Sequence, residues 1–152
     1  MKRASRIKHA GEWAVSESID RVVLDADERT RRRIVLTGDK GTSILLDLES
    51  PMTLRDGDGL VLDDGSIVAV MGMPEPLMDV ASESKRDLLR FAWHIGNRHT
   101  GLQIVGDKLR VRRDHVLEDM LRQMGATLTQ VEAPFEPEAG SHPQHGPDQH
   151  GE

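Results

Sequence analysis

Histidine is the residue type in this sequence with the most scope for site chemistry. The chain has 152 residues, of which seven are histidine and none is cysteine. Without thiols, disulfides and thiol catalysis are excluded, and a transition-metal site must use imidazole, carboxylate, thioether or backbone ligands. Imidazole suits nickel, copper and zinc, so the binding of such a cation is the first chemistry to consider.

Three of the histidines lie close together near the end of the chain. They are His142, His145 and His150, and they share residues 137–152 with several prolines, glycines and acidic residues. Their loose spacing matches no rigid zinc template, but a His-rich tract on a polar backbone suits borderline cations. The scarcity of apolar residues predicts that this tail is disordered. The alternative is that the tail is inert and its histidines are only solvated.

His99 differs from the other histidines in its setting. It ends the run Gly96-Asn97-Arg98-His99, just beyond a predicted helix end and before a predicted strand. A lone loop imidazole is most often a surface residue and cannot hold a metal tightly. In a two-fold dimer with His99 near the axis, however, the same ligand is supplied twice, and the two copies could share one ion.

The remaining three histidines have simpler structural explanations. His9 lies near an amino terminus that we expect to be frayed. His94 falls in the last turn of a predicted helix, where it can meet free carbonyls. His115 follows a predicted helix cap and is expected to be a partly exposed residue of the first turn.

The first half of the chain has the pattern of short strands separated by turns. The predicted strands cover residues 34–36, 44–48, 60–62 and 67–70. Asp-Gly turns between such strands indicate hairpins, because glycine accepts the positive φ that these turns require. We therefore predict a small all-β domain over residues 1–73. Its Arg-rich run, residues 29–33, is expected along an exposed strand with the long side chains covering apolar surface.

The second half changes its hydrophobic period. Residues 71–76 contain two prolines, which interrupt a regular ladder and indicate a linker. A strand at 77–80 precedes a helix that Ser82 or Ser84 could cap. The apolar stripe of that helix consists of Leu88, Leu89, Ala92, Trp93 and Ile95, and Gly96 ends it.

Two further strands, a helix and a last strand complete this half. The strands at 102–105 and 109–111 flank a Gly106-Asp107 turn, and the second helix begins at Asp114 and closes at Gly125. The apolar face of that helix consists of Val116, Leu117, Met120, Leu121 and Met124, and Leu128 and Val131 mark the last strand. The order of strand, helix, strand, strand, helix, strand predicts an α+β chain whose residues 74–136 form a ferredoxin-like βαββαβ domain. That fold hosts many functions and decides none alone.

Charge and hydrophobicity narrow the function classes. The chain has 26 acidic and 20 basic residues, which argues against a non-specific grip on nucleic acid or on an anionic membrane. No apolar run approaches the roughly 20 residues that span a bilayer, and none of signal length follows the charged first residues. We expect a cytoplasmic protein that binds neither nucleic acid nor membrane.

Three segments in order resemble the signatures of one family. They are residues 91–103, which contain Gly-Asn-Arg-His, residues 114–121, which contain Asp-His-Val-Leu-Glu-Asp-Met-Leu, and residues 133–138, Ala-Pro-Phe-Glu-Pro-Glu. The combination is similar to the urease accessory nickel chaperones, UreE. The Arg31-Arg32-Arg33 strand and the Asp56-Gly57-Asp58 turn also fit the first domain of that family, so the resemblance covers nearly the whole chain.

The resemblance implies a homodimeric nickel metallochaperone and not an enzyme. It implies a protein-contact domain at 1–73, a metal-binding and dimerisation domain at 74–136, and a histidine-bearing tail. Ni(II) would be the cargo, held by His99 from each protomer with help from the tail histidines His142, His145 and His150. The urease accessory GTPase and the urease apoprotein complex would be the partners. Cu(II) or Zn(II) would compete, since copper binds such ligands at least as well as nickel.

One residue departs from the pattern of some family members. Arg113 occupies the place where these members carry a further histidine before the Asp-His pair. This cation would repel a metal ion from an accessory site centred on His115.

Two other classes of function stay open at this point. A metal-dependent hydrolase could use Asp114-His115 as a base pair and His99 as a ligand, although the sequence has no nucleophile motif, phosphate loop or HExxH. A ferredoxin-like nucleic-acid-binding module would present stacking aromatics on its sheet. The predicted strands of the second domain contain no aromatic residue.

Overall fold

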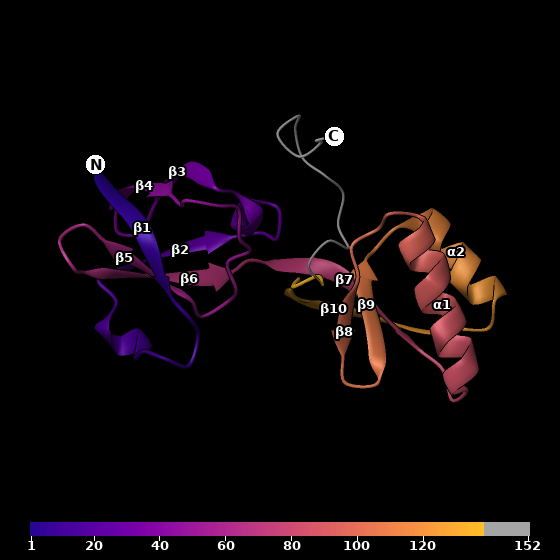
Figure 1. The fold of residues 1–152 in the computed structure, drawn as a ribbon. Helices are drawn as coiled ribbons and strands as arrows, with labels where there is room; N and C mark the ends of the chain where they lie inside the picture. The colour runs from indigo at the N-terminus through magenta and orange to yellow at the C-terminus, as the bar shows by residue number, and fades with distance from the viewer. Residues whose placement is uncertain (139–152) are drawn as a thin grey trace. The chain divides into compact units, whose positions relative to one another are not determined.

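The computed structural model describes residues 1–138, and the chain divides into two compact units, Met1–Pro74 and a second that begins at Glu75. The first unit consists of strands and two short 3-10 turns, and the second combines strands with two helices (Figure 1). The chain is therefore α+β, with the all-β part first, and this prediction is confirmed.

The first unit is a six-stranded sheet in the order β2-β6-β5-β1-β4-β3. Its elements are β1 (Lys2–Lys8), η1 (Val15–Glu17), β2 (Asp20–Leu24), η2 (Glu28–Thr30), β3 (Arg33–Thr37), β4 (Ser43–Asp47), β5 (Gly59–Leu62) and β6 (Ile67–Gly72). The predicted hairpins are present, since β3 pairs antiparallel with β4 and β5 with β6. The parallel pairs β1 with β4 and β2 with β6 and the antiparallel pair β1 with β5 complete the sheet, which has an aliphatic core.

The amino terminus is not frayed, contrary to our expectation. Residues Lys2–Lys8 form β1 in the middle of the sheet, with β5 on one side and β4 on the other. Ala4 is fully buried and Ile7 packs against the core. The other residues of the strand are charged or polar, which is why its apolar signal in the sequence is weak.

The Arg-rich run is also not uniformly exposed. Arg31, Arg32 and Arg33 are exposed, but Arg29 lies in the η2 turn and is fully buried. Its Nε donates to the carbonyl of Leu24 at 3.2 Å and its Nη1 to that of Leu54 at 3.3 Å. The prediction of an exposed strand was therefore wrong for Arg29, whose guanidinium satisfies backbone carbonyls inside the unit. It holds only for Arg33, because β3 begins there and Arg31 and Arg32 precede the strand.

The second unit has the predicted order of elements. They are β7 (Pro74–Ala81), α1 (Lys85–Asn97), β8 (Gln103–Val105), β9 (Lys108–Arg112), α2 (His115–Gln123) and β10 (Thr127–Pro134). The strands form one sheet in the order β10-β7-β9-β8, and this βαββαβ order is the ferredoxin-like arrangement. The two prolines that we assigned to a linker instead lie inside β7. The register of β7 with β9 begins at Leu77, so both prolines precede that ladder.

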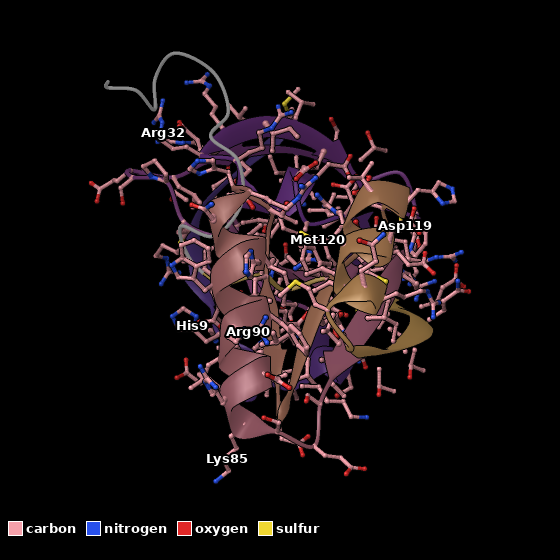
Figure 2. All side chains as sticks on the ribbon, turned by 90° about the vertical axis from the view of Figure 1, so that its right-hand side faces the viewer. His9, Arg32, Lys85, Arg90, Asp119 and Met120 are labelled. Atoms are coloured by element: carbon pink, nitrogen blue, oxygen red, sulfur yellow. The ribbon has the colours of Figure 1, made fainter. Side chains whose placement is uncertain are left out.

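Both helices begin at the predicted type of cap. The Ser84 hydroxyl accepts the N–H of Asp87 at 3.1 Å, and the Asp114 carboxylate accepts the N–H of Leu117 at 2.9 Å. In Figure 2, Met120 of α2 lies between the two helices, while Asp119 lies on the outer side of α2. Neither α1 nor α2 has the length and apolar content that a membrane crossing requires.

The apolar stripes of the helices are only partly in the core. Phe91 and Ile95 of α1 are fully buried, whereas Leu89 is 72% and Trp93 64% exposed. Val116 of α2, which we also expected to be buried, is 60% exposed. Residues 89 and 93 are placed on the face of α1 opposite Phe91, because successive residues turn by about 100°. The sequence pattern thus merged two apolar faces into one.

Candidate metal centre

His99 stands at the carboxyl end of α1 in a left-handed backbone conformation. Its φ is 58°, and among the described residues it is the one non-glycine with positive φ. Its N–H donates to the carbonyl of Gly96 at 3.0 Å, directly after the cap residue Arg98. This position of a helix usually carries glycine, and histidine is among the few other residues that tolerate it. The side chain is exposed. The fold therefore fixes the backbone of His99 and leaves its imidazole open to solvent.

The two helix histidines occupy the places that the sequence predicts. His94 lies in the last turn of α1, where its half-buried ring meets the ring of Trp93 edge-on at 4.9 Å. His115 is the first residue of α2 and is exposed. Strands β7 and β9 are antiparallel, and each is followed by a helix that runs back along the sheet. The carboxyl end of α1 and the amino end of α2 therefore lie at the same end of the sheet.

Two arginines and an engaged carboxylate lie near His115. Arg113 is exposed two residues before it, and Arg122 donates to Glu118 at 2.8 Å. The pKa of the Glu118 carboxyl is lowered, chiefly by this hydrogen bond and further by the charges of Arg122, His115 and Arg113. Glu118 is thus already engaged by a cation, and these contacts make His115 a poor centre for an accessory metal site.

His99 is the one member of the predicted ligand set that the structure describes. The predicted tail ligands His142, His145 and His150 lie outside the described residues. Within residues 1–138, no three His, Asp or Glu side chains come close enough together to hold a metal ion. The described part of one chain therefore provides a single exposed imidazole at the predicted position.

Three large apolar side chains of the two helices are exposed. They are Leu89, Trp93 and Val116, which we call together the outer apolar face. Trp93 is near the carboxyl end of α1 and Val116 is in the first turn of α2, so both lie toward the same end of the sheet as His99. Exposed aromatic and aliphatic side chains on adjoining elements are typical of an interaction surface. The sequence signal for this surface is the excess of apolar residues around α1, which we had assigned entirely to the core.

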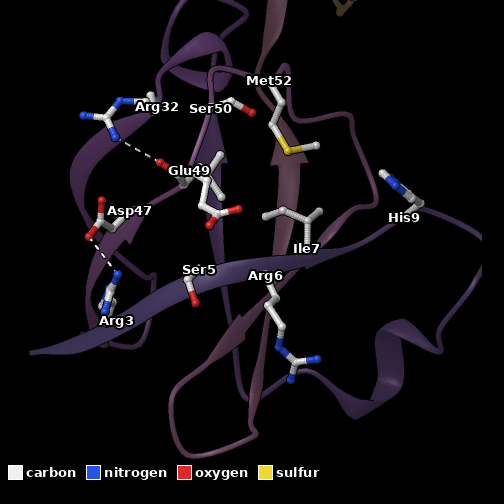
Figure 3. A pocket seen from close by; sticks show the side chains of 11 residues that line it. Arg3, Ser5, Arg6, Ile7, His9, Arg32, Asp47, Glu49, Ser50 and Met52 are labelled. Atoms are coloured by element: carbon white, nitrogen blue, oxygen red, sulfur yellow. Dashed lines mark hydrogen bonds and ion pairs between the residues drawn. The ribbon is translucent and has the colours of Figure 1, made fainter.

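The first unit contains a pocket of about 640 Å³ beside β1. In Figure 3, Arg32 reaches the carbonyl of Leu48 and Arg3 reaches Asp47, while His9 and Glu49 stand at different parts of the wall. The distances are 3.0 Å for the hydrogen bond and 3.2 Å for the ion pair. The lining thus mixes paired charges with a separate imidazole and lacks the convergent donors of a metal site.

Comparison with known proteins gives matches over nearly the whole chain. Residues 2–71 match the N-terminal domain of the UreE urease accessory protein family, and residues 75–152 match its C-terminal domain. The urease accessory protein UreE of Rhodopseudomonas palustris (strain HaA2) is 48% identical over 142 residues, which are 93% of this chain and 66% of that protein. The UreE protein of Bradyrhizobium sp. (strain ORS 278) is 45% identical, over 93% of this chain and 67% of its own.

A third relative is matched over more of its own length. The urease accessory protein UreE of Beijerinckia indica subsp. indica is 43% identical over 150 residues, 99% of this chain and 86% of that protein. The chain spans about two thirds of the length of the first two relatives. Because both domains match in order and the identity exceeds 40% throughout, the chain belongs to the UreE family of urease accessory proteins and is an accessory protein rather than an enzyme.

Proposed function

We propose that this protein is a nickel carrier that supplies Ni(II) for assembly of the urease active site. The observation that carries the proposal is His99, an exposed imidazole on a fixed left-handed backbone within the family's Gly-Asn-Arg-His segment. Imidazole is a suitable ligand for nickel, and the absence of cysteine removes the thiolates that softer ions prefer. Copper and zinc compete for such a site, so selectivity for nickel depends on supply and on partners.

The proposed site is shared by two protomers. One imidazole provides one ligand, and a two-fold axis close to His99 would bring a second copy of it to the same ion. The outer apolar face supports this arrangement, since Trp93 and Val116 lie toward the same end of the sheet as His99 and are largely exposed in one chain. Burying them in a dimer would stabilise the association through the hydrophobic effect.

The tail completes and unloads the site in this proposal. His142, His145 and His150 add imidazoles to the pair of His99 residues, and water fills positions that remain. Ligands that come and go one at a time allow stepwise transfer of the ion to an acceptor. We take the urease accessory GTPase and the urease apoprotein complex as the acceptors, on the strength of the family to which the chain belongs.

Nickel titration calorimetry combined with light scattering tests the proposal. The set consists of the unchanged protein, His99→Ala, a chain ending at Glu138, and His115→Ala as the matched control. His115 is an exposed histidine of the same unit, but it is not part of the proposed site. We expect the unchanged protein to be a dimer whose tightest event takes one nickel ion per dimer.

The variants separate the contributions to the site. His99→Ala should abolish the tightest event, whereas His115→Ala should retain it. The chain ending at Glu138 should stay dimeric and bind fewer ions. If His99→Ala binds nickel as the unchanged protein does, the principal site lies elsewhere and the shared His99 site is wrong.

A further inference from the structure

The third segment that resembles a family signature, residues 133–138, meets the first of these segments in the structure. Strand β10 ends at Pro134, and residues 135–138, which we call the strap, leave it across the sheet. The N–H of Glu136 donates to Oε1 of Gln103 in β8 at 2.9 Å. Since β10 and β8 are the two outer strands, the strap connects the two edges of the sheet.

A buried aromatic ring anchors the strap. Phe135 is 1% exposed, and the guanidinium of Arg112 in β9 lies 5.2 Å from the centre of its ring. Nε of Arg112 also donates to Oε1 of Glu75 at 2.8 Å, and Pro137 of the strap is buried as well. The strap is therefore a packed part of the second unit, held against strand β9.

The hydrogen bonds of the strap go to the residues that follow His99. Besides the bond to Gln103, the N–H of Glu138 donates to the carbonyl of Leu102 at 2.7 Å. Leu102 also packs against the core of the second unit, and Gly101 before it is buried. The strap thus holds the loop that carries His99 on the side that leads into β8.

The end of α1 holds the same loop from the other side. The N–H of His99 donates to the carbonyl of Gly96 at 3.0 Å, and two residues separate His99 from Leu102, whose carbonyl the strap binds. A non-glycine residue with positive φ persists where its surroundings fix it. The left-handed conformation of His99, with its φ of 58°, is therefore fixed by the helix on one side and by the strap on the other.

We infer that the strap positions His99, through the side chain of Gln103 and the N–H of Glu138, and keeps its loop in the conformation that binds metal. Both are positioning groups, which act through the backbone of the loop and do not bind nickel. The inference rests on the proposed function for the identity of the ion, whereas the contacts between strap and loop exist without it. It also gives a role to residues 133–138, which the proposed function does not use.

The size of the effect follows from the population of the metal-binding conformation. The dissociation constant rises in proportion as the fraction of protein in that conformation falls. The positive φ of His99 opposes this conformation, so the loop leaves it more readily once a bond to the strap is lost. One intramolecular hydrogen bond changes such an equilibrium by about twofold to tenfold. We therefore expect loss of either strap bond to weaken the tightest nickel event by about threefold to tenfold.

Two matched pairs of variants in the full chain test the two strap bonds. Gln103→Met removes the acceptor oxygen at nearly constant side-chain length, and Gln103→Glu retains an acceptor there. Glu138→Pro removes the N–H that the carbonyl of Leu102 accepts, and Glu138→Ala keeps that N–H while it removes the same side chain. Nickel titration calorimetry should show the weakening in Gln103→Met and Glu138→Pro, and an affinity close to that of the unchanged protein in Gln103→Glu and Glu138→Ala.

His99→Ala distinguishes the inference from the proposed function. Gln103→Met combined with His99→Ala should bind nickel as His99→Ala alone does, because the strap acts through His99. An equal weakening in the presence and in the absence of His99 would show a general structural effect and overturn the inference. An unchanged affinity in His99→Ala itself would refute the proposed function, and the positioning of His99 is then decided without metal.

Amide hydrogen exchange of the metal-free protein measures this positioning directly. The N–H of His99 is bonded to the carbonyl of Gly96, so its exchange rate reports how often the left-handed turn opens. We expect this amide to exchange at least threefold faster in Gln103→Met and Glu138→Pro, and at an unchanged rate in Glu138→Ala. Gln130→Met is the control for the substitution itself, since Gln130 is an exposed residue of β10, and it should leave the rate unchanged. An exchange rate of His99 that is the same in Gln103→Met, Glu138→Pro and the unchanged protein would overturn the inference.

Discussion

At the scale of single residues, the backbone of His99 holds a conformation that glycine would adopt more easily. Its φ of 58° is in the left-handed region, where an L side chain costs about 1–2 kcal/mol. Glycine avoids that cost but loses about 0.5–1 kcal/mol through greater freedom in the unfolded chain. We therefore predict that His99→Gly raises the free energy of unfolding by up to about 1 kcal/mol while removing the nickel ligand.

Urea unfolding of the metal-free protein measures this gain. His99→Ala is the control, since alanine keeps the strained φ and also lacks the imidazole. It should be no more stable than the unchanged protein, and it should lose nickel binding like His99→Gly. A His99→Gly variant that is less stable than His99→Ala would contradict the predicted strain, because both variants lack the imidazole and differ in how well they tolerate a positive φ.

The position of His99 was predictable, but its conformation was not. Gly96 and the loss of helical period placed this histidine beyond a helix end, and the structure confirms that placement. The left-handed turn, however, results from how the last carbonyls of α1 are satisfied, which the sequence of the loop does not specify. Arg29 shows the same limit, because its burial depends on carbonyls of Leu24 and Leu54 that lie 5 and 25 residues away.

At the scale of elements, one carboxylate joins strand β2 to the loop between β3 and β4. Asp20 is 4% exposed and accepts backbone N–H groups of Arg21 at 2.7 Å, Lys40 at 2.9 Å and Thr42 at 3.2 Å. Gly38 lies so close that any side chain there would collide with this carboxylate. Burial tends to raise the pKa of Asp20, but the hydrogen bonds from Thr42, Lys40 and Arg21 together lower it to about 2.

This lowered pKa predicts how stability depends on pH. Because the folded pKa is below the value of about 3.9 in the unfolded chain, the contribution of Asp20 is fully present above about pH 4 and is lost as the pH falls toward 2. Asp20→Asn should cost about 1–3 kcal/mol at pH 7, since buried donors lose a charged acceptor. It should also flatten the decline of unfolding free energy between pH 4 and 2.

Denaturant unfolding at pH 7, 4 and 2 measures both effects. Asp39→Asn is the matched control, because Asp39 forms an exposed ion pair with Arg21 at 2.7 Å, and such pairs contribute less than about 1 kcal/mol. If Asp20→Asn lowers the free energy of unfolding at pH 7 no more than Asp39→Asn does, the hydrogen bonds of Asp20 to the loop between β3 and β4 do not stabilise the fold.

The helices and strands were predictable where the hydrophobic period of the sequence and its cap or turn residues indicate the same element. The Ser84 and Asp114 caps and the two predicted hairpins of the first unit are present, because local chemistry determines each of them. Strand β1 was missed because its pairing with β4 and β5 is long-range and only Ala4 and Ile7 carry an apolar signal. The two prolines were assigned to a linker because proline interrupts a ladder, but both lie in β7 ahead of Leu77, where the pairing with β9 starts.

At the scale of the whole molecule, the apolar pattern of a helix cannot distinguish a core from an interface. Leu89, Trp93 and Val116 were assigned to the buried apolar faces of the helices, and the structure leaves all three exposed. Packing within one chain needs only the face of α1 that contains Phe91. The exposed apolar residues, Leu89, Trp93 and Val116, therefore have no packing role within a single chain.

We predict that the outer apolar face forms the contact between two copies of the chain, so Trp93→Glu should convert a dimer into a monomer. Trp93 is 64% exposed in one chain, so the substitution should leave each unit folded while it places charges in the contact. The mass from light scattering should fall from twice the chain mass to the 16.9 kDa of one chain, and the nickel event shared by the two His99 residues should weaken at least tenfold. Val35→Glu is the control, since Val35 is 57% exposed and belongs to the first unit, which contains neither of the two α-helices. A dimer that survives Trp93→Glu would mean that His99 is shared through another surface or is not shared at all. A monomer that still binds one nickel ion tightly would mean that the tail, and not a second copy of His99, completes the site.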